Sequence, residues 1–263
     1  MGDGAAHPAG RPVVTTPTQP LPRRITPANV LVTPLVLLAA LGALFWYLSG
    51  LELDDIERRS INADTILTHL WEHVELVAVS SVLVIVIAVP LGVLLTRPAL
   101  RLVTPPLLGL ANIGQAIPSI GILVLLAVTV GIGFDKAVLA LVALAMLPVL
   151  RNTMIGVSTV DKSLIDAARG MGLTRTTVLL RVELPLAVPV ILAGVRIALI
   201  LNVSSATLAT YTNAGGLGTL IATGVTLNRL PVLITGSVLT AVLALTVDWL
   251  AGLAEAALRP RGI

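Results

Sequence analysis

Long stretches almost free of charged residues constrain this sequence more than any other feature. A helix needs about 20 apolar residues to cross about 30 Å of hydrocarbon, and six stretches of this kind occur in the chain. They lie at residues 30–48, 74–95, 103–132, 137–155, 187–211 and 230–251. The sequence therefore predicts an all-α integral membrane protein with about six transmembrane helices.

Two of these stretches are longer than one crossing requires. Residues 102–134 and 197–228 contain no charged side chain at all. We expect each to contain a break in the helix or a re-entrant piece, because a single straight helix of that length would protrude from the bilayer.

Composition excludes several other classes of protein. Charged residues make up 12% of the chain, against about 25% in an average soluble domain. Cysteine is absent, so the chain offers neither disulfides nor thiolate ligands. His69 and His73 have the i, i+4 spacing of a metal-binding helix face, but no third ligand is evident, and no metal site is expected. The basic residues are dispersed with few aromatics between them, which argues against nucleic-acid binding.

The distribution of Lys and Arg predicts the orientation. With the N-terminus inside, twelve basic residues fall on the cytoplasmic side and four outside, as the positive-inside rule requires. Both termini are therefore expected in the cytoplasm. Residues 1–29 contain six prolines, and a segment of this composition buries too little apolar surface to fold, so we expect a disordered cytoplasmic tail.

The polar loop between the fourth and fifth stretches has the local features of a short helix. Ser163 is placed to cap its N-terminus with Asp166 three residues on, and Gly172 is placed to end it in a left-handed conformation. One apolar side would then carry Leu164, Ile165, Ala168 and Met171. Such a face, held at the cytoplasmic surface, suits a groove on a soluble partner.

The same loop resembles the EAA motif of ABC importer permeases. That motif has an acidic residue and two alanines, then a glycine four positions later, then nine residues and a hydrophobic-x-Leu-Pro sequence. Asp166, Ala167 and Ala168, then Gly172, then residues 182–185 (Val-Glu-Leu-Pro) reproduce the spacing. Asp replaces Glu and Val replaces Ile. The resemblance implies a type I importer (MetI-like) permease fold. It also implies a coupling helix that docks on an ATPase subunit, with the contact residues Ser163, Asp166, Ala167, Ala168, Arg169, Gly170, Gly172, Leu184 and Pro185.

A broader resemblance covers most of residues 65–258. Residues 112–119, 147–153, 193–196 and 214–218 are similar to segments of permeases for glycine betaine, choline, carnitine and proline-type osmoprotectants. This implies a bacterial inner-membrane importer with two ATPase subunits, a second permease chain, identical or homologous, and an extracytoplasmic binding protein. In this interpretation residues 30–64 form a first transmembrane helix and outer loop, and residues 65–258 form the permease domain with its coupling loop at 157–185.

ATP and Mg²⁺ are expected on the partner subunits, because the sequence contains no G-x-x-x-x-G-K-[ST] phosphate-binding loop. No catalytic site and no cofactor are expected in this chain.

Only seven aromatic residues occur (three Trp, two Tyr and two Phe), too few for an aromatic cage around a quaternary ammonium group. Selection of the solute is therefore expected on the binding protein.

Two polar segments are candidates for the lining of the pathway. Pro118 interrupts the third stretch, and the backbone groups it frees need protein or water around them; a simple packing kink is the alternative. The glycine-rich turn near residue 215 fits a re-entrant closure of the outer end. The candidate residues are Gln115, Pro118, Ser119, Asn213, Gly215 and Gly216.

Besides Arg151, which is among the twelve basic residues assigned to the cytoplasmic side, three charged residues lie within the apolar stretches. Glu75, Arg196 and Asp248 are unfavourable in lipid, so each should face protein or water. Our hypothesis is that Arg196 pairs with Asp248; placement at the membrane surface is the alternative.

Three other functions stay open from sequence alone: an ABC permease for another small solute such as methionine, a secondary transporter or channel acting alone, and a membrane scaffold.

Overall fold

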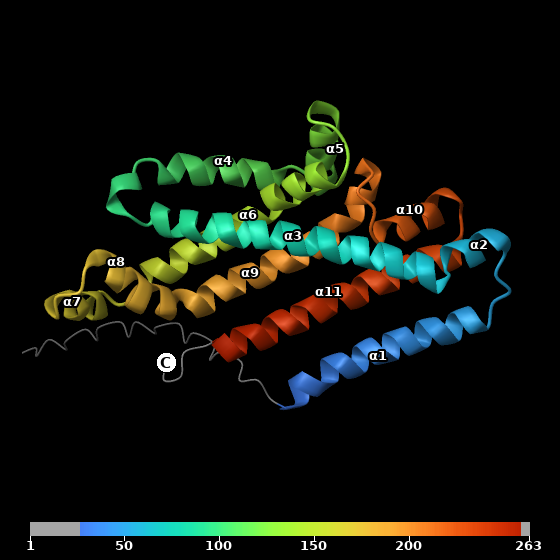
Figure 1. Ribbon diagram of the computed structural model, residues 1–263, viewed down its shortest axis with the longest axis horizontal. Helices are drawn as coiled ribbons and strands as arrows, with labels where there is room; N and C mark the ends of the chain where they lie inside the picture. Colours follow the sequence, from blue (N-terminus) through green and yellow to red (C-terminus); the bar gives the residue numbers. More distant parts are fainter. Residues whose placement is uncertain (1–26, 259–263) are drawn as a thin grey trace, which may run out of the picture.

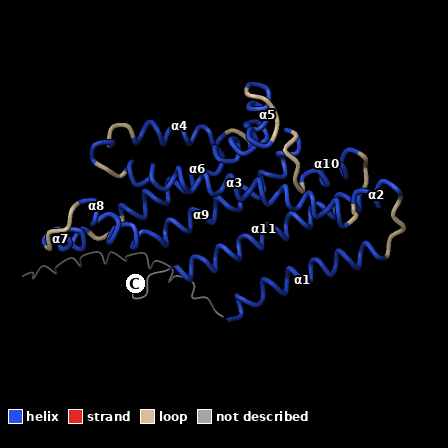
Figure 2. Tube along the Cα trace, in the orientation of Figure 1, coloured by secondary structure: helices blue, strands red, loops and turns tan. Residues whose placement is uncertain are grey.

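The computed structural model describes residues 27–258, and every regular element in this range is helical (Figures 1 and 2). The expected tail, residues 1–29, lies largely outside this range, except that residues 27–29 already belong to the first helix. The elements are α1 Pro27–Ser49, α2 Asp55–Ser60, α3 Ala63–Leu95, η1 Pro98–Leu100, α4 Thr104–Ala116, α5 Ser119–Thr129, α6 Phe134–Ser158, α7 Lys162–Gly170, α8 Arg175–Val178, the π-turn η2 Leu179–Glu183, α9 Leu184–Ala206, η3 Thr207–Thr212, α10 Gly218–Thr226 and α11 Leu230–Leu258.

Five helical stretches in the described part of the chain are long and apolar enough to cross a membrane. They are α1, α3, α6, the continuous stretch Arg175–Thr212 that contains α9, and α11. The remaining predicted span, 103–132, is divided into α4 and α5, and neither half is long enough to cross alone. The break expected there is present: Pro118 has an extended backbone (φ −54°, ψ 138°) and directly precedes α5.

The break expected in the uncharged interval 197–228 is also present. Helix α9 ends at Ala206, tightens into η3 and reaches Asn213, whose left-handed backbone (φ 59°) ends the helical path. The chain then turns and forms the short helix α10. The second span, in contrast, begins earlier than predicted. Helix α3 starts at Ala63 rather than near residue 74, because Asn62 caps it by accepting a hydrogen bond from the Thr65 amide at 2.8 Å.

Helix α6 lies at the centre of the bundle and packs most extensively against α3 and α9. Its buried side chains are small or branched, among them Leu141, Ala145 and Val149. Helix α11 packs against α9 and α10, and α1 lies on the outer side of α11 (Figure 1). Helices α4 and α5 lie on the opposite side, against α6 and η3.

Three glycines set the distance between α6 and its neighbours. A Cβ added to Gly92 of α3 would lie 2.7 Å from Thr153 Cβ of α6. One added to Gly156 of α6 would lie 3.1 Å from the Ala187 carbonyl oxygen of α9, and one added to Gly194 of α9 would lie 2.5 Å from Asn152 Cβ. Small residues at these points let the backbones approach closely, as is typical of helices packed within a membrane.

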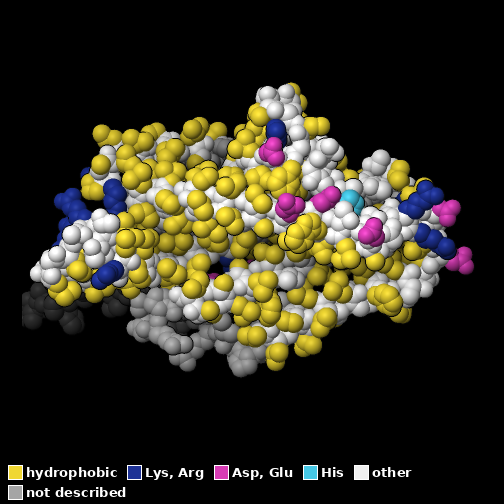
Figure 3. All heavy atoms as spheres, in the orientation of Figure 1, with side chains coloured by type: hydrophobic (Ala, Val, Ile, Leu, Met, Phe, Trp, Pro, Cys, Tyr) yellow, Lys and Arg dark blue, Asp and Glu magenta, His cyan; other side chains and the backbone are white. Residues whose placement is uncertain are grey.

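Charged side chains gather at the two ends of the long axis. Figure 3 shows hydrophobic side chains over most of the middle of the visible face, with Lys and Arg at the end where α7 and α8 lie and mixed charges near α2. A few acidic side chains and one basic side chain lie between the middle and the α2 end. We call the end with α7 and α8 the loop end, and the end with α2 and α10 the turn end. The apolar middle between two charged ends is the surface expected of a membrane-spanning bundle.

Enlarging Gly194 should loosen the bundle. In Gly194→Leu the new side chain meets Asn152 and the Pro148 carbonyl of α6, so we expect the free energy of unfolding to fall by about 1–3 kcal/mol. Thermal unfolding of the purified protein in detergent measures the change. Gly109→Leu in α4 is the control, because a Cβ there meets nothing within 4 Å. Equal unfolding temperatures for the two variants would contradict the packing role.

Candidate functional site

The loop between α6 and α9 forms a discrete helix, α7, with a cap at its N-terminus. The cap is Asp161, whose Oδ1 accepts a hydrogen bond from the Ser163 backbone amide at 2.8 Å. The sequence-based assignment of Ser163 as the cap was therefore wrong by two residues. The extended backbone lies at Asp161 (φ −59°, ψ 125°) and Ser163 is already within the helix, where its amide is one of those that need an external acceptor.

The C-terminus of α7 follows the sequence-based prediction. Gly172 has φ +84°, the left-handed conformation that favours glycine. Its amide donates to the Arg169 carbonyl at 2.9 Å, and the Leu173 amide donates to the Ala168 carbonyl at 3.2 Å. These two bonds form a Schellman motif, which satisfies the last carbonyls of a helix. Helix α7 therefore has a defined start and a defined end.

The apolar residues of α7 divide between two environments. Ala168 is buried, with 2% of its surface exposed, where α7 packs on α8 and η2. Leu164 and Met171 are exposed at 48% and 76%, and Ile165 is half-buried. The sequence predicted that these four residues form one exposed apolar face. That prediction was wrong, because Ala168 faces the protein interior. The other motif residues of α7 are exposed: Ser163, Asp166, Ala167, Arg169 and Gly170.

The motif continues into the start of the α9 span. Helix α8, capped by Thr174, runs through the π-turn η2 into α9 without a break in helical backbone. Leu184 and Pro185 are the first two residues of α9, directly after the π-turn. The Leu184 amide donates to the Leu179 carbonyl, and Pro185 has no amide hydrogen that would need an acceptor. Leu184 is half-buried and packs beside a small core of Val157, Ala187 and Ile191, whereas Pro185 is exposed.

The first group of predicted pathway residues lies at the break between α4 and α5. Gln115 and Pro118 are exposed and Ser119 is half-buried. The Gln115 side-chain amide donates to the Leu144 carbonyl of α6 at 3.4 Å, and the Arg151 guanidinium of α6 donates to the Asn112 carboxamide of α4. Polar side chains thus hold α4 against α6 close to the break.

The second group lies in the turn between η3 and α10. Gly215 and Gly216 have positive φ values of 76° and 93°, beside Asn213 at 59°. Helix α3 holds this turn: Glu72 Oε2 accepts from the Gly216 amide at 2.8 Å and contacts His69 Nδ1 at 3.0 Å. Helix α5 connects the two groups of predicted pathway residues. It begins at the break after Pro118 and packs against η3, which ends at the glycine-rich turn.

Sequence reasoning missed the role of Glu72 and His73. His73 is fully buried and donates from Nε2 to the Val203 carbonyl of α9 at 3.1 Å, while a Cβ at Gly216 would lie 3.1 Å from its Nδ1. The signal was the spacing of His69, Glu72 and His73, which places them on one side of α3. Their contacts are structural, and the described residues contain no group of three or more ligands suited to a metal ion.

The predicted pairing of Arg196 with Asp248 is present. The guanidinium donates to both carboxylate oxygens, from Nε at 2.5 Å and from Nη2 at 2.7 Å, and Glu255 lies 3.9 Å from Nη1. The pair joins α9 to α11 and remains about one-third exposed. Glu75, the third intramembrane charge, is exposed on α3.

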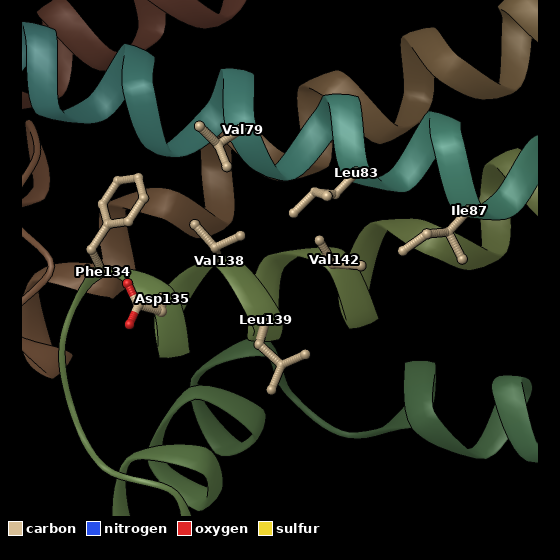
Figure 4. A pocket seen from close by; sticks show the side chains of 8 residues that line it. All are labelled: Val79, Leu83, Ile87, Phe134, Asp135, Val138, Leu139 and Val142. Atoms are coloured by element: carbon tan, nitrogen blue, oxygen red, sulfur yellow. The ribbon is translucent and has the colours of Figure 1, made fainter.

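An apolar groove lies between α3 and α6 (Figure 4). It has a volume of about 360 Å³ and contains a single ionisable side chain, Asp135, which pairs with Lys136 at 3.2 Å. The other lining residues are Val79, Leu83, Ile87, Phe134, Val138, Leu139 and Val142. None of the predicted pathway residues lines this groove.

The family of the chain follows from its sequence matches. Residues 88–260 match the family described as the binding-protein-dependent transport system inner membrane component. The chain belongs to this family. Its members are permease subunits of ABC importers, so the chain functions with ATPase and substrate-binding subunits. The matched residues include α7 and every residue of the EAA-like motif.

Curated relatives cover most of this permease. The carnitine transport permease protein OpuCB of Listeria monocytogenes is 39% identical over 202 residues, which cover 77% of this chain and 92% of that protein. The osmoprotectant import permease protein OsmY of Salmonella typhimurium is 37% identical over 227 residues, 86% of this chain and 93% of that protein. The choline transport system permease protein OpuBB of Bacillus subtilis is 37% identical over 202 residues, 77% of this chain and 92% of that protein.

A solved structure shares the fold. The MetNI methionine ABC transporter in an inward-facing conformation matches with a TM-score of 0.65 and 27% identity, covering 74% of this permease and 96% of that chain. The MetI-like permease fold expected from the motif is therefore confirmed.

Acid should loosen α7 through its cap. Hydrogen bonds from the Ser163 backbone amide and then its hydroxyl lower the pKa of Asp161 below its ordinary value. The cap therefore stabilises α7 at pH values above the ordinary aspartate pKa and is lost as pH falls through the lowered pKa. Hydrogen exchange of the Ser163 amide in Asp161→Ala should be several-fold faster at neutral pH than in the unaltered protein. Asp161→Asn keeps an acceptor oxygen and should protect this amide with little dependence on pH. An unchanged rate in Asp161→Ala would exclude the cap.

Proposed function

We propose that this permease imports a small osmoprotectant of the trimethylammonium type, such as carnitine, choline or glycine betaine, delivered by a separate binding protein. The three relatives support this solute class, because they are permeases for carnitine, an osmoprotectant and choline, and the matches cover most of the chain. The scarcity of aromatic residues supports selection on the binding protein rather than in the membrane.

Helix α7 is the observation that carries the transport mechanism. It is a capped helix at one end of the bundle, and its exposed Leu164 and Met171 offer an apolar contact to a soluble subunit. It continues through α8 and η2 into α9, so a displacement of α7 is passed by covalent connection into the membrane. The ATPase subunits hold ATP and Mg²⁺ and hydrolyse the nucleotide, and this chain contributes no catalytic site.

The assembly contains two permease chains, two ATPase subunits and one binding protein. The loop end and both termini face the cytoplasm of a bacterial cell, with the permease in the inner membrane. The excess of Lys and Arg in the segments on that side supports this orientation. The turn end then faces the binding protein.

The pathway passes the break at Pro118 and the turn at Gly215 and Gly216. Freed backbone groups and positive φ values at these places support this assignment, since irregular backbone within a membrane protein needs protein or water around it. In this mechanism closure of the ATPases moves α7, the bundles of the two permeases rock, and the turn end opens to receive the solute.

Uptake by the reconstituted complex tests the proposal. Proteoliposomes that contain the permease, its ATPase and its binding protein should accumulate radiolabelled carnitine, choline or glycine betaine only with ATP inside the vesicle. Methionine and proline serve as comparison solutes. Uptake that persists without the ATPase would support a secondary transporter or channel, and preference for methionine would overturn the solute class.

Enlarging Ala168 should separate ATP hydrolysis from uptake. In Ala168→Leu the added side chain cannot fit where α7 packs on α8 and η2, so α7 is displaced while the membrane helices keep their contacts. We expect uptake per ATP hydrolysed to fall about tenfold or more, because ATP-driven movement of the ATPase subunits no longer reaches the membrane helices. Ala99→Leu is the control, since Ala99 is exposed in η1. Normal coupling in Ala168→Leu with the complex assembled would remove the coupling role from α7.

A further inference from the structure

A charged pair at the loop end joins two elements that are far apart in sequence. Arg97 directly follows the C-cap of α3, and Glu183 is the last residue of the π-turn before α9. The guanidinium donates from Nη2 to Glu183 Oε2 at 2.7 Å and from Nη1 to Oε1 at 3.4 Å. This is a two-point contact, which fixes the direction as well as the distance between its partners.

The burial of the pair makes it hard to open. The Glu183 side chain is only 7% exposed, while Arg97 is 35% exposed and reaches it from the surface. Among the described residues, Arg97 is the cation that contacts Glu183. A buried carboxylate without a partner is strongly destabilising, so Glu183 and Arg97 should stay together when either element moves.

Glu183 lies where α7 meets the membrane helix. The five residues of η2 form a π-turn, and α7 and α8 both pack on it. Turns of this kind insert one extra residue into a helix and often mark functional positions. A displacement of α7 therefore reaches η2 both directly and through α8, and Glu183 is the last residue of η2 before α9.

Arg97 is equally well anchored on its own side. The Thr96 hydroxyl donates to the Val93 carbonyl at 2.7 Å, closing the end of α3. The Thr104 hydroxyl at the start of α4 contacts the Leu95 and Leu100 carbonyls at 3.0 and 2.9 Å. Arg97 thus belongs to a compact turn that joins α3 to α4, and a pull on its side chain acts on both helices.

We propose that Arg97 and Glu183 are positioning residues that transmit the displacement of α7 to α3 and α4 at the same time as the backbone transmits it to α9. The proposal rests on the coupling role of α7 proposed above. Without the pair, α9 still moves with α7, but α3 follows only through its contacts inside the bundle, namely its packing on α6 and α9 and the hydrogen bonds of Ser81 and His73 to α9. The pair thus makes the two principal neighbours of α6 move together.

The main test separates transport from ATP hydrolysis in the assembled complex. Glu183→Gln removes the buried charge, and the side-chain amide of Arg97→Gln can still donate a hydrogen bond to the Glu183 carboxylate. Both variants should therefore retain assembly and ATPase activity, while uptake per ATP falls between about twofold and about thirtyfold, the range found for coupling residues outside ligand sites. The charge exchange R97E/E183R should recover most of the loss, and R97E alone should not. Arg101→Gln is the matched control, because Arg101 is exposed in the same connection and contacts no carboxylate among the described residues.

A second measurement distinguishes positioning from simple stabilisation. Hydrogen exchange with and without a trapped nucleotide should show changes at the ends of both α3 and α9 in the unaltered complex, but only at α9 in Arg97→Gln. Because the chain has no native cysteine, R97C/E183C can also be joined by a bifunctional thiol reagent. The joined variant should regain coupling, with the unsubstituted permease treated in the same way as its control.

The outcomes are distinct for the pair and for the function. If the unaltered complex imports none of the tested solutes, the proposed function fails. If it does import them and both Gln variants couple normally, the pair has no positioning role. If every variant of the pair fails to assemble, Arg97 and Glu183 are folding elements and the proposal is equally overturned.

Discussion

Close approach of backbones around α6 is the constraint on which the rest of this permease depends. Lipid tails are as apolar as leucine, so helices in a bilayer gain little from hiding apolar surface and associate through packing and hydrogen bonds. Gly92, Gly156 and Gly194 bring α3 and α9 within backbone contact of α6. Buried hydrogen bonds between α3 and α9, such as Asn202 Nδ2 to Ser81 Oγ at 2.9 Å, then become possible. The loop, the turn and the peripheral helices are all attached to this three-helix centre.

Much of the fold was predictable because the membrane imposes simple rules. A spanning helix must be long, apolar and internally hydrogen-bonded, so the stretches almost free of charge located α1, α6, α9 and α11 closely. The same rule predicted the pairing of Arg196 with Asp248, since few charges exist at that depth and each needs a partner. Gly172 was predictable from the local geometry of helix ends.

The contacts at the two ends of the bundle were not predictable, for a physical reason. Water is available near the membrane surface, so a charge there needs no protein partner and its sequence gives no hint of one. Glu72 and Gly216 are 144 residues apart, and Arg97 and Glu183 are 86 residues apart. The cap of α7 was misassigned for a similar reason: Asp161 and Ser163 are both good caps, and only the backbone angles decide between them.

Helix α3 connects both ends. Its Glu72 holds the glycine-rich turn, and Arg97, two residues beyond its last residue, holds the π-turn below α7. A helix of 33 residues is about 50 Å long and resists compression, so a displacement at one end must appear at the other unless the helix bends. Pro90 is the place where it bends most readily, because proline removes a backbone hydrogen bond. Pro90 lies near the Arg97 end of α3, so the longer part of the helix, from Pro90 to the end that contacts the Gly215–Gly216 turn, moves as one rigid unit. One helix therefore links the Arg97–Glu183 pair beside α7 to the Glu72–Gly216 contact at the turn end, with Pro90 as the single point between them where it bends readily.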